Sequence, residues 1–219
     1  MISVKIKSIL PIENEPLVAV SAELVCDGFR ECKKLIVPVE FCRENGIVRG
    51  ISDENTYAKL CEAAKLCEAV RRGEAILAFS QNSKNALKSK LIRRGIEKNT
   101  AEKAVEALAE KGFIDDRENA LAEAERSVKK LWGAKRIMSH LAQKGYRGAA
   151  LDNVSAYLED VDFISNCCAL ISKKYPGALS AERQERDRAV AGLIRYGYSF
   201  SQVRAAIHRA GGEYEDFDD

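Results

Sequence analysis

Apolar residues along most of the chain follow a helical spacing, and one short pattern occurs three times. Leu91-Ile92-Arg93-Arg94-Gly95-Ile96 is matched by Leu141-Ala142-Gln143-Lys144-Gly145-Tyr146 and by Leu193-Ile194-Arg195-Tyr196-Gly197-Tyr198. The three glycines are 50 and 52 residues apart. Recurrence at such a period is typical of helical repeat arrays, in which each unit buries one face against its neighbours. Arrays of this kind usually present a long binding surface, which favours a binding protein over an enzyme.

The pattern extends on both sides of each glycine. One apolar residue stands four positions before the leucine, and others stand six, nine and thirteen positions after the glycine. In the order of the three copies they are Leu87, Ile137 and Ala189; Ala101, Leu151 and Val203; Ala104, Val154 and Ala206; and Leu108, Leu158 and Ala210. These offsets form one stripe on a helix. Each copy is therefore predicted to be a helix, a left-handed glycine cap and a second helix.

The three copies differ in how clearly a capping residue marks the start of the second helix. Asn99 or Thr100 is expected to cap it in the first copy, and Ser199 with Gln202 forms a capping box in the third. The second copy has a weaker start at Arg147-Gly148.

Residues 1–50 alternate between apolar and polar positions instead, which predicts strands. Val4 and Ile6 indicate one strand, and the segments 18–24 and 35–41 indicate two more. Asp27-Gly28 lies between the last two and is a preferred dipeptide for a tight hairpin turn. A small antiparallel sheet is expected here.

The predicted fold class is mainly α, with about three tandem three-helix repeats behind a small N-terminal antiparallel β region. A helix is expected from Ser52 or Asp53 to Arg72, with an interruption at Gly73 and a short helix to Phe79. The predicted boundaries are 1–50 for the β region, 51–73 for a linking helix, 74–112, 113–160 and 161–212 for the repeats, and 213–219 for an acidic tail.

Charge is spread unevenly over these parts. Residues 1–73 carry 11 basic and 11 acidic groups, residues 74–212 carry 24 and 17, and the tail carries 5 acids, for a net charge of +2. A basic array permits contact with nucleic acid or with a protein bound to it. From charge alone, an ordinary solvated helical surface fits equally well.

Several classes of function are disfavoured. No apolar run approaches the roughly 18–20 residues of a membrane span, and the first residues lack a signal-peptide pattern, so a cytoplasmic protein is expected. The seven cysteines form no CxxC pair, which favours reduced, buried thiols and no metal site. Asp115 and Asp116 are expected to cap a helix, and His140 and His208 stand alone. No catalytic or cofactor motif is present, so we expect neither an enzyme nor a bound cofactor.

Trp132, the only tryptophan, opens the segment Trp132-Gly133-Ala134-Lys135-Arg136-Ile137. Its ring could stack on a base or anchor a protein partner, but a lone tryptophan at a helix junction more often packs in the core. Lys135 and Arg136 place positive charge at a helix start, where it opposes the helix dipole. A local cost of this kind is a hint of function.

Several ordered pieces of the chain resemble the RecX family of bacterial recombination regulators. Ala75 to Gly95 is similar to the family's first repeat, and Phe113-Ile114-Asp115-Asp116 is similar to the acidic signature of its middle repeat. Gly133-Ala134-Lys135-Arg136-Ile137 resembles the second repeat, and Gly197-Tyr198-Ser199 the third. The resemblance covers about residues 55–211, and the chain departs from the family pattern at Arg117-Glu118-Asn119.

The resemblance implies a protein that binds the filament of the RecA recombinase on single-stranded DNA. It would modulate, and by expectation inhibit, filament extension, ATP hydrolysis and strand exchange, as a monomer with at most weak DNA binding of its own. A direct nucleic-acid-binding repeat protein and a protein–protein adaptor remain as alternatives. The candidate contact residues are Arg93, Arg94, Trp132, Lys135, Arg136, Lys144, Arg147 and Arg195.

Overall fold

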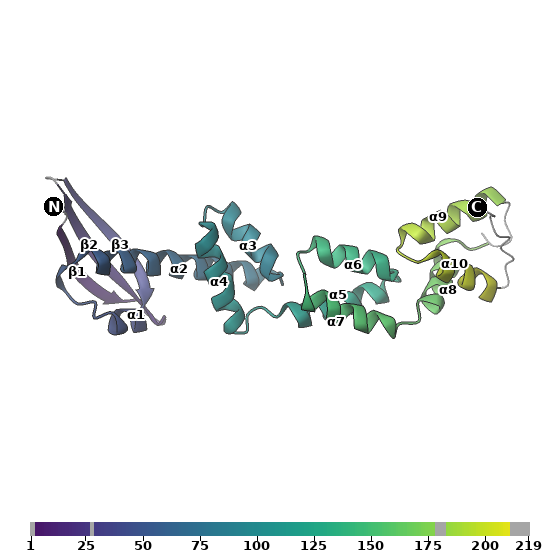
Figure 1. The fold of residues 1–219 in the computed structure, drawn as a ribbon, viewed down its shortest axis with the longest axis horizontal. Coiled ribbons are helices and arrows are strands. Elements are labelled where there is room, and N and C mark those ends of the chain that lie inside the picture. The colour runs from purple at the N-terminus through teal and green to yellow at the C-terminus, as the bar shows by residue number, and fades with distance from the viewer. Residues whose placement is uncertain (1–2, 27–28, 178–182, 211–219) are drawn as a thin grey trace. The chain divides into compact units, whose positions relative to one another are not determined.

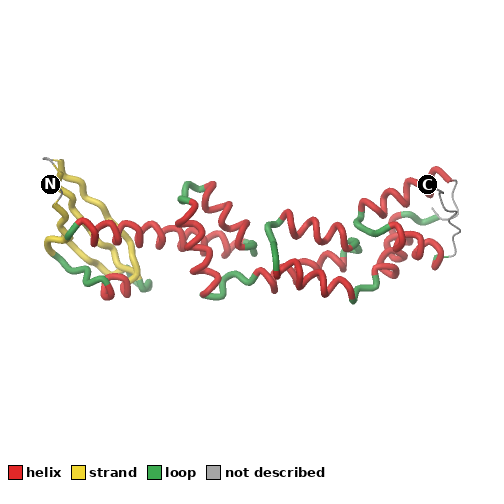
Figure 2. Tube along the Cα trace, in the orientation of Figure 1, coloured by secondary structure: helices red, strands yellow, loops and turns green. Residues whose placement is uncertain are grey.

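A computed structural model of the chain describes residues 3–26, 29–177 and 183–210, and shows a small sheet followed by helices (Figures 1 and 2). The sheet is antiparallel, with strand order β3-β2-β1-β4. Its strands are β1 (Ser3–Pro11), β2 (Leu17–Cys26), β3 (Phe29–Pro38) and β4 (Gly50–Ser52). The predicted antiparallel sheet is confirmed, while the predicted turn at Asp27-Gly28 lies outside the described residues.

Helices make up most of the described chain, and none of those described is long and apolar enough to cross a membrane. They are α1 (Val39–Glu44), α2 (Glu54–Phe79), α3 (Lys84–Arg93), α4 (Lys98–Glu110), α5 (Asp116–Lys129), α6 (Ala134–Gln143), α7 (Ala149–Glu159), α8 (Phe163–Lys174), α9 (Arg183–Arg195) and α10 (Phe200–Arg209). The predicted mainly α class with a small N-terminal sheet is therefore confirmed.

The chain divides into two compact units. The first comprises Met1–Gln81 and Leu87–Phe113, and the second comprises Asn82–Ala86 and Ile114–Asp219. In the first unit, α2 packs on the sheet and on α4. In the second unit, α5 packs against α6 and α7, and α10 packs against α8 and α9, so that two three-helix groups follow one another. The finer repeat boundaries, including the acidic tail, stay predictions.

The sheet and helix α2 differ from the sequence prediction at two points. The third strand ends at Pro38, and Val39 and Phe41 belong to α1, because proline cannot donate to a strand ladder and suits a helix start. Helix α2 runs through Gly73 without a break. A Cβ atom at Gly73 would lie 2.5 Å from Cδ1 of Leu108 on α4, so this glycine permits close helix packing and does not end a helix.

The glycine caps are confirmed. Gly95, Gly145 and Gly197 have φ values of +85°, +93° and +97°, which side chains other than glycine rarely adopt. In each copy the amide after the glycine donates to the carbonyl of the repeated leucine, as in the hydrogen bond of 3.1 Å from Tyr146 to Leu141. This is the Schellman geometry expected when a left-handed glycine closes a helix.

The apolar stripes are buried as predicted, with two exceptions: Leu151 is half-buried and Ala210, which follows α10, is exposed. The capping box of Ser199 and Gln202 is confirmed. The predicted cap at Asn99 or Thr100 is wrong, because α4 already begins at Lys98 with Glu97 as a cap residue that makes no side-chain bond.

A glycine-to-glycine contact joins the start of α6 to the end of α9. The amide of Gly133 donates to Tyr196 O at 2.9 Å, and the amide of Lys135 donates to Gly197 O at 3.2 Å. A Cβ atom on Gly133 would lie 2.2 Å from the carbonyl carbon of Gly197. The buried Tyr198 adds a bond from its hydroxyl to Leu131 O at 2.9 Å. The first amides of one helix are thus satisfied by the last carbonyls of another.

We expect Gly133→Ala to destabilise the second unit by about 3 kcal/mol, because its methyl group would meet main-chain atoms that cannot move aside. Urea unfolding followed by the fluorescence of Trp132, the only tryptophan, reports on this unit. Gly177→Ala is the matched control: its methyl group enters open space and costs only the strain of a φ of +81°, about 1 kcal/mol. Equal losses in the two variants would contradict the packing argument.

Candidate binding interface

The candidate basic residues of the first unit lie at the end of α3. Arg93 and Arg94 are exposed and line a hollow of about 580 Å³ together with Phe79, whose side chain is 91% exposed. The main-chain oxygen of Arg94 accepts a bond of 3.0 Å from the guanidinium of Arg72. Both arginine side chains are thus exposed at this hollow, with an apolar ring beside them.

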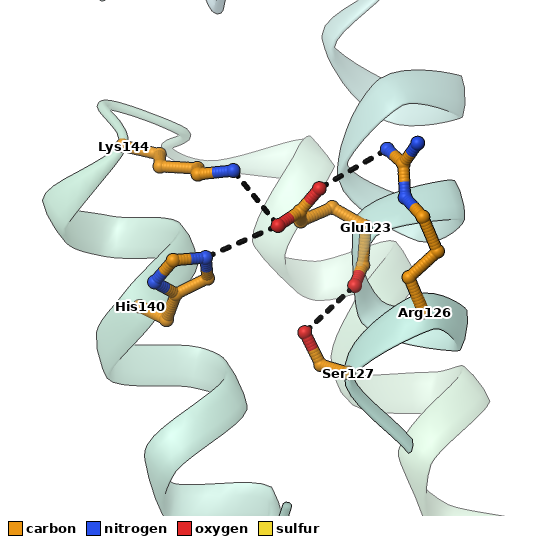
Figure 3. A network of polar contacts seen from close by, with 5 residues as sticks. All are labelled: Glu123, Arg126, Ser127, His140 and Lys144. Atoms are coloured by element: carbon orange, nitrogen blue, oxygen red, sulfur yellow. Dashed lines mark hydrogen bonds and ion pairs between the residues drawn. The ribbon is translucent and has the colours of Figure 1, made fainter. Parts of the chain in front are cut away.

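Two of the candidate contact residues in the second unit, Lys144 and Arg147, form contacts within the protein. Lys144 pairs with Glu123 at 2.8 Å, and the carboxylate of Glu123 also contacts His140 Nε2 at 3.1 Å and Arg126 at 3.0 Å (Figure 3). Arg147 donates to Ala142 O and, at 2.6 Å, to Tyr146 O, so that its charge lies at the carbonyl end of α6. These contacts hold α5 and α6 together and close α6.

The Glu123 carboxylate is largely enclosed, with 15% of the side chain exposed. Burial alone would raise the pKa of Glu123, but the hydrogen bonds from Lys144 and His140 outweigh it and hold this pKa below its usual value. The folded protein therefore favours the ionised carboxylate.

Trp132 and Arg136 belong to a row of alternating cations and aromatic rings, which we call the cation–aromatic ladder. The guanidinium carbon of Arg136 lies 4.1 Å from the ring centroid of Trp132 and 4.8 Å from that of Tyr196. Lys130 Nζ lies 5.8 Å from the Trp132 centroid, and Lys174 Nζ lies 4.4 Å from the Tyr196 centroid. The five residues come from α6 and from the ends of α5, α8 and α9.

The ladder changes the interpretation of Trp132. The ring is half-buried, has a guanidinium over its face and stands edge-on to His140 at 5.1 Å between centroids. It is therefore neither a fully buried core residue nor an open platform for a base. Lys135, next to Arg136 on α6, is exposed and takes no part in these ring contacts, and Arg195 is exposed at the end of α9.

Three ladder residues were missed by the sequence analysis: Lys130, Lys174 and Tyr196. Lys174 also donates a hydrogen bond to the Tyr196 hydroxyl, and this bond lowers the pKa of that hydroxyl. One signal was available for Tyr196, because it stands before the cap glycine where the other copies have Arg94 and Lys144. Nothing in the sequence indicated Lys130 or Lys174, since each lies at the end of a helix, where lysines are common.

The paired acids act on two different helices. Asp115 caps α5 as predicted, accepting bonds from the amides of Arg117 and Glu118 at 2.8 and 3.1 Å. Asp116 lies in the first turn of α5, where its charge is favourable to the helix dipole, but the prediction that it caps this helix is wrong. Its carboxylate accepts a bond of 3.0 Å from the amide of Lys84, so it caps the start of α3. Burial raises the pKa of Asp116.

Free thiols are found at Cys32, Cys42, Cys61, Cys67, Cys167 and Cys168. Burial raises the pKa of Cys42 and Cys67, and that of Cys167 to about 12. Cys32 is exposed, so the prediction of buried thiols is wrong for this residue. The part of the chain that the structure describes contains no group of three His, Cys, Asp or Glu residues able to hold a metal ion.

Similar proteins share both the sequence and the architecture of this chain. A regulatory protein RecX of Halorhodospira halophila is 32% identical over 137 residues, which are 62% of this chain and 83% of that protein. The chain belongs to the RecX family. A regulatory protein RecX of Vibrio vulnificus is 27% identical over 132 residues, 60% of this chain and 86% of that protein. No family model matches the chain.

Solved RecX structures agree on the fold. A crystal structure of regulatory protein RecX has a TM-score of 0.74 at 20% identity and covers 94% of this chain and 99% of that one. The structure of RecX from Lactobacillus salivarius has a TM-score of 0.61 at 15% identity, over 68% and 98% of the two chains. As a member of the RecX family, by its relation to the Halorhodospira protein, the chain is a regulatory protein and not an enzyme.

We expect Glu123→Gln to destabilise the second unit by about 1–2 kcal/mol near neutral pH, because it weakens charge-assisted bonds. Since the pKa of Glu123 is lower in the folded protein than its usual 4.5, the stabilisation is present above that value and is lost as the pH falls through the folded-state pKa. Urea unfolding at several pH values measures the loss.

The difference between wild type and Glu123→Gln should therefore shrink below about pH 4.5. Glu125→Gln is the control, because Glu125 is an exposed acid on the same helix without an ion pair to another described residue. A pH-independent loss in Glu123→Gln would contradict the role of the charge.

Proposed function

We propose that this RecX-family protein regulates the RecA recombinase by binding its filament on single-stranded DNA and inhibiting filament extension, ATP hydrolysis and strand exchange. The observation that carries the proposal is the relation to regulatory protein RecX over 83% of that protein's length. The matching architecture supports it, since a solved RecX chain is covered over 99% of its length.

The chemistry of the helical part is consistent with a partner that carries negative charge. Residues 74–212 contain 24 basic and 17 acidic groups. Arg93, Arg94, Lys135 and Arg195 are exposed. A RecA filament offers both a protein surface and a DNA backbone, and an array of exposed arginines suits either.

A second candidate function is direct binding of nucleic acid without RecA. The positive excess of residues 74–212 favours it, and it predicts affinity that falls steeply with salt. A third candidate function is that of an adaptor for another protein. Such an adaptor would bind neither RecA nor nucleic acid.

ATP hydrolysis by the RecA of the same bacterium on single-stranded DNA tests the proposal. Titration of this protein below the RecA concentration should suppress hydrolysis, because a regulator that blocks filament extension acts at few sites. Suppression that appears only when this protein is in excess over RecA would instead favour simple competition for the strand. No effect at any ratio would contradict the proposal.

A further inference from the structure

We propose that the cation–aromatic ladder (Lys130, Trp132, Arg136, Tyr196 and Lys174) binds the phosphodiester backbone of single-stranded nucleic acid without contacting its bases. This inference deepens the proposed function and rests on it for the biological partner. It assigns a surface and a mode of contact that can be measured in the absence of RecA.

The charges of the ladder have no counterion among the described residues. Within the described residues, no carboxylate forms an ion pair with Lys130, Arg136 or Lys174, whereas Lys144 and Arg126 are both paired with Glu123. Arg136 and Lys174 lie 4.8 and 4.4 Å from the centroid of the same ring. Gathering like charges without a carboxylate costs free energy, and a bound polyanion offsets that cost.

The geometry of Arg136 favours a phosphate. Its guanidinium carbon lies close to two aromatic rings, 4.1 Å from the centroid of Trp132 and 4.8 Å from that of Tyr196. The N–H donors of a guanidinium suit the two oxygens of a phosphate in a bidentate pair. The half-buried Arg136 is in contact with both rings, so less side-chain entropy is lost on binding.

The same geometry disfavours contact with bases. A stacked base needs a bare aromatic face, but Arg136 lies over Trp132, and Tyr196 has Arg136 and Lys174 over its ring. The ladder therefore offers cations to the backbone and little ring surface to a base. Binding should be independent of base identity and should depend on salt.

The main-chain contact of Gly133 with Gly197 keeps the ladder assembled. It fixes the start of α6, which carries Arg136, against the cap of α9, next to Tyr196. The half-buried Arg136 is thus presented on a rigid junction, while the exposed Lys130 and Lys174 flank it at helix ends.

The test measures binding of a labelled oligothymidine and of an abasic oligonucleotide of the same length by fluorescence anisotropy, using the full chain without RecA. We expect both to bind equally well. Lys174→Gln and Arg136→Gln should each weaken binding about tenfold. Each should also reduce the salt slope by about 0.7, as expected for one lost phosphate contact on a single strand.

Lys173→Gln is the matched control, because Lys173 is an exposed lysine on the same helix that lies outside the ladder. It should change the affinity less than twofold. Lys174 is exposed, so its substitution should leave the fold intact, and thermal unfolding checks both ladder variants.

Three outcomes would overturn the inference. Loss of binding to the abasic strand would indicate base stacking, and an equal loss of affinity in Lys173→Gln and Lys174→Gln would indicate attraction by diffuse charge. The third outcome is that the wild-type protein binds neither oligonucleotide. If DNA binding is absent but the ladder variants lose suppression of RecA ATP hydrolysis, the ladder contacts an acidic protein surface and the proposed function stands. If wild type also fails to suppress hydrolysis, the proposed function fails separately.

Discussion

The arrangement of the second unit depends on close contact between the start of one helix and the glycine cap of another. Gly133 at the start of α6 donates its amide to Tyr196 O beside the cap of α9, at a separation that excludes a Cβ atom. Helix starts have free amides and helix ends have free carbonyls, so such a contact satisfies both. It also fixes the position of α6 relative to α9, because the main-chain atoms of the two segments are in direct contact.

A similar contact occurs at the cap of α6, with side chains in place of main-chain donors. Ser83 Oγ donates to Lys144 O at 2.7 Å and Asn85 Nδ2 donates to Gly145 O at 2.9 Å. A Cβ atom on Gly145 would lie 2.7 Å from Ser83 Oγ. Gly145 and Gly197 therefore have two roles: each adopts the left-handed conformation that ends a helix, and each allows another segment to approach closely. Around Gly95 no atom lies within 4 Å of the corresponding Cβ position.

Cations in this unit are held in two ways with different consequences. Lys144 and Arg126 share the carboxylate of Glu123, which neutralises their charge and joins two helices. Arg136 and Lys174 are held by aromatic rings, which orient the positive groups and leave their charge uncompensated. Only the second arrangement leaves charge available to a partner, which is why the proposed contacts centre on the rings.

Features that depend on residues close together in the chain could be predicted from the amino-acid sequence. The caps at Gly95, Gly145 and Gly197 and the capping box of Ser199 depend on interactions within about two turns of helix, so local spacing predicts them. The apolar stripes are predicted by helical spacing, which gathers their residues on one face of each helix. Resemblance to RecX added the family. The roles of residues that meet from distant parts of the chain could be seen only in the tertiary structure. Gly73 lies inside an unbroken helix, Asp116 accepts a bond from the amide of Lys84, 32 positions away, and Arg136 lies close to both Trp132 and Tyr196. These outcomes depend on packing between segments that approach one another only in the folded chain, and no local pattern encodes that approach.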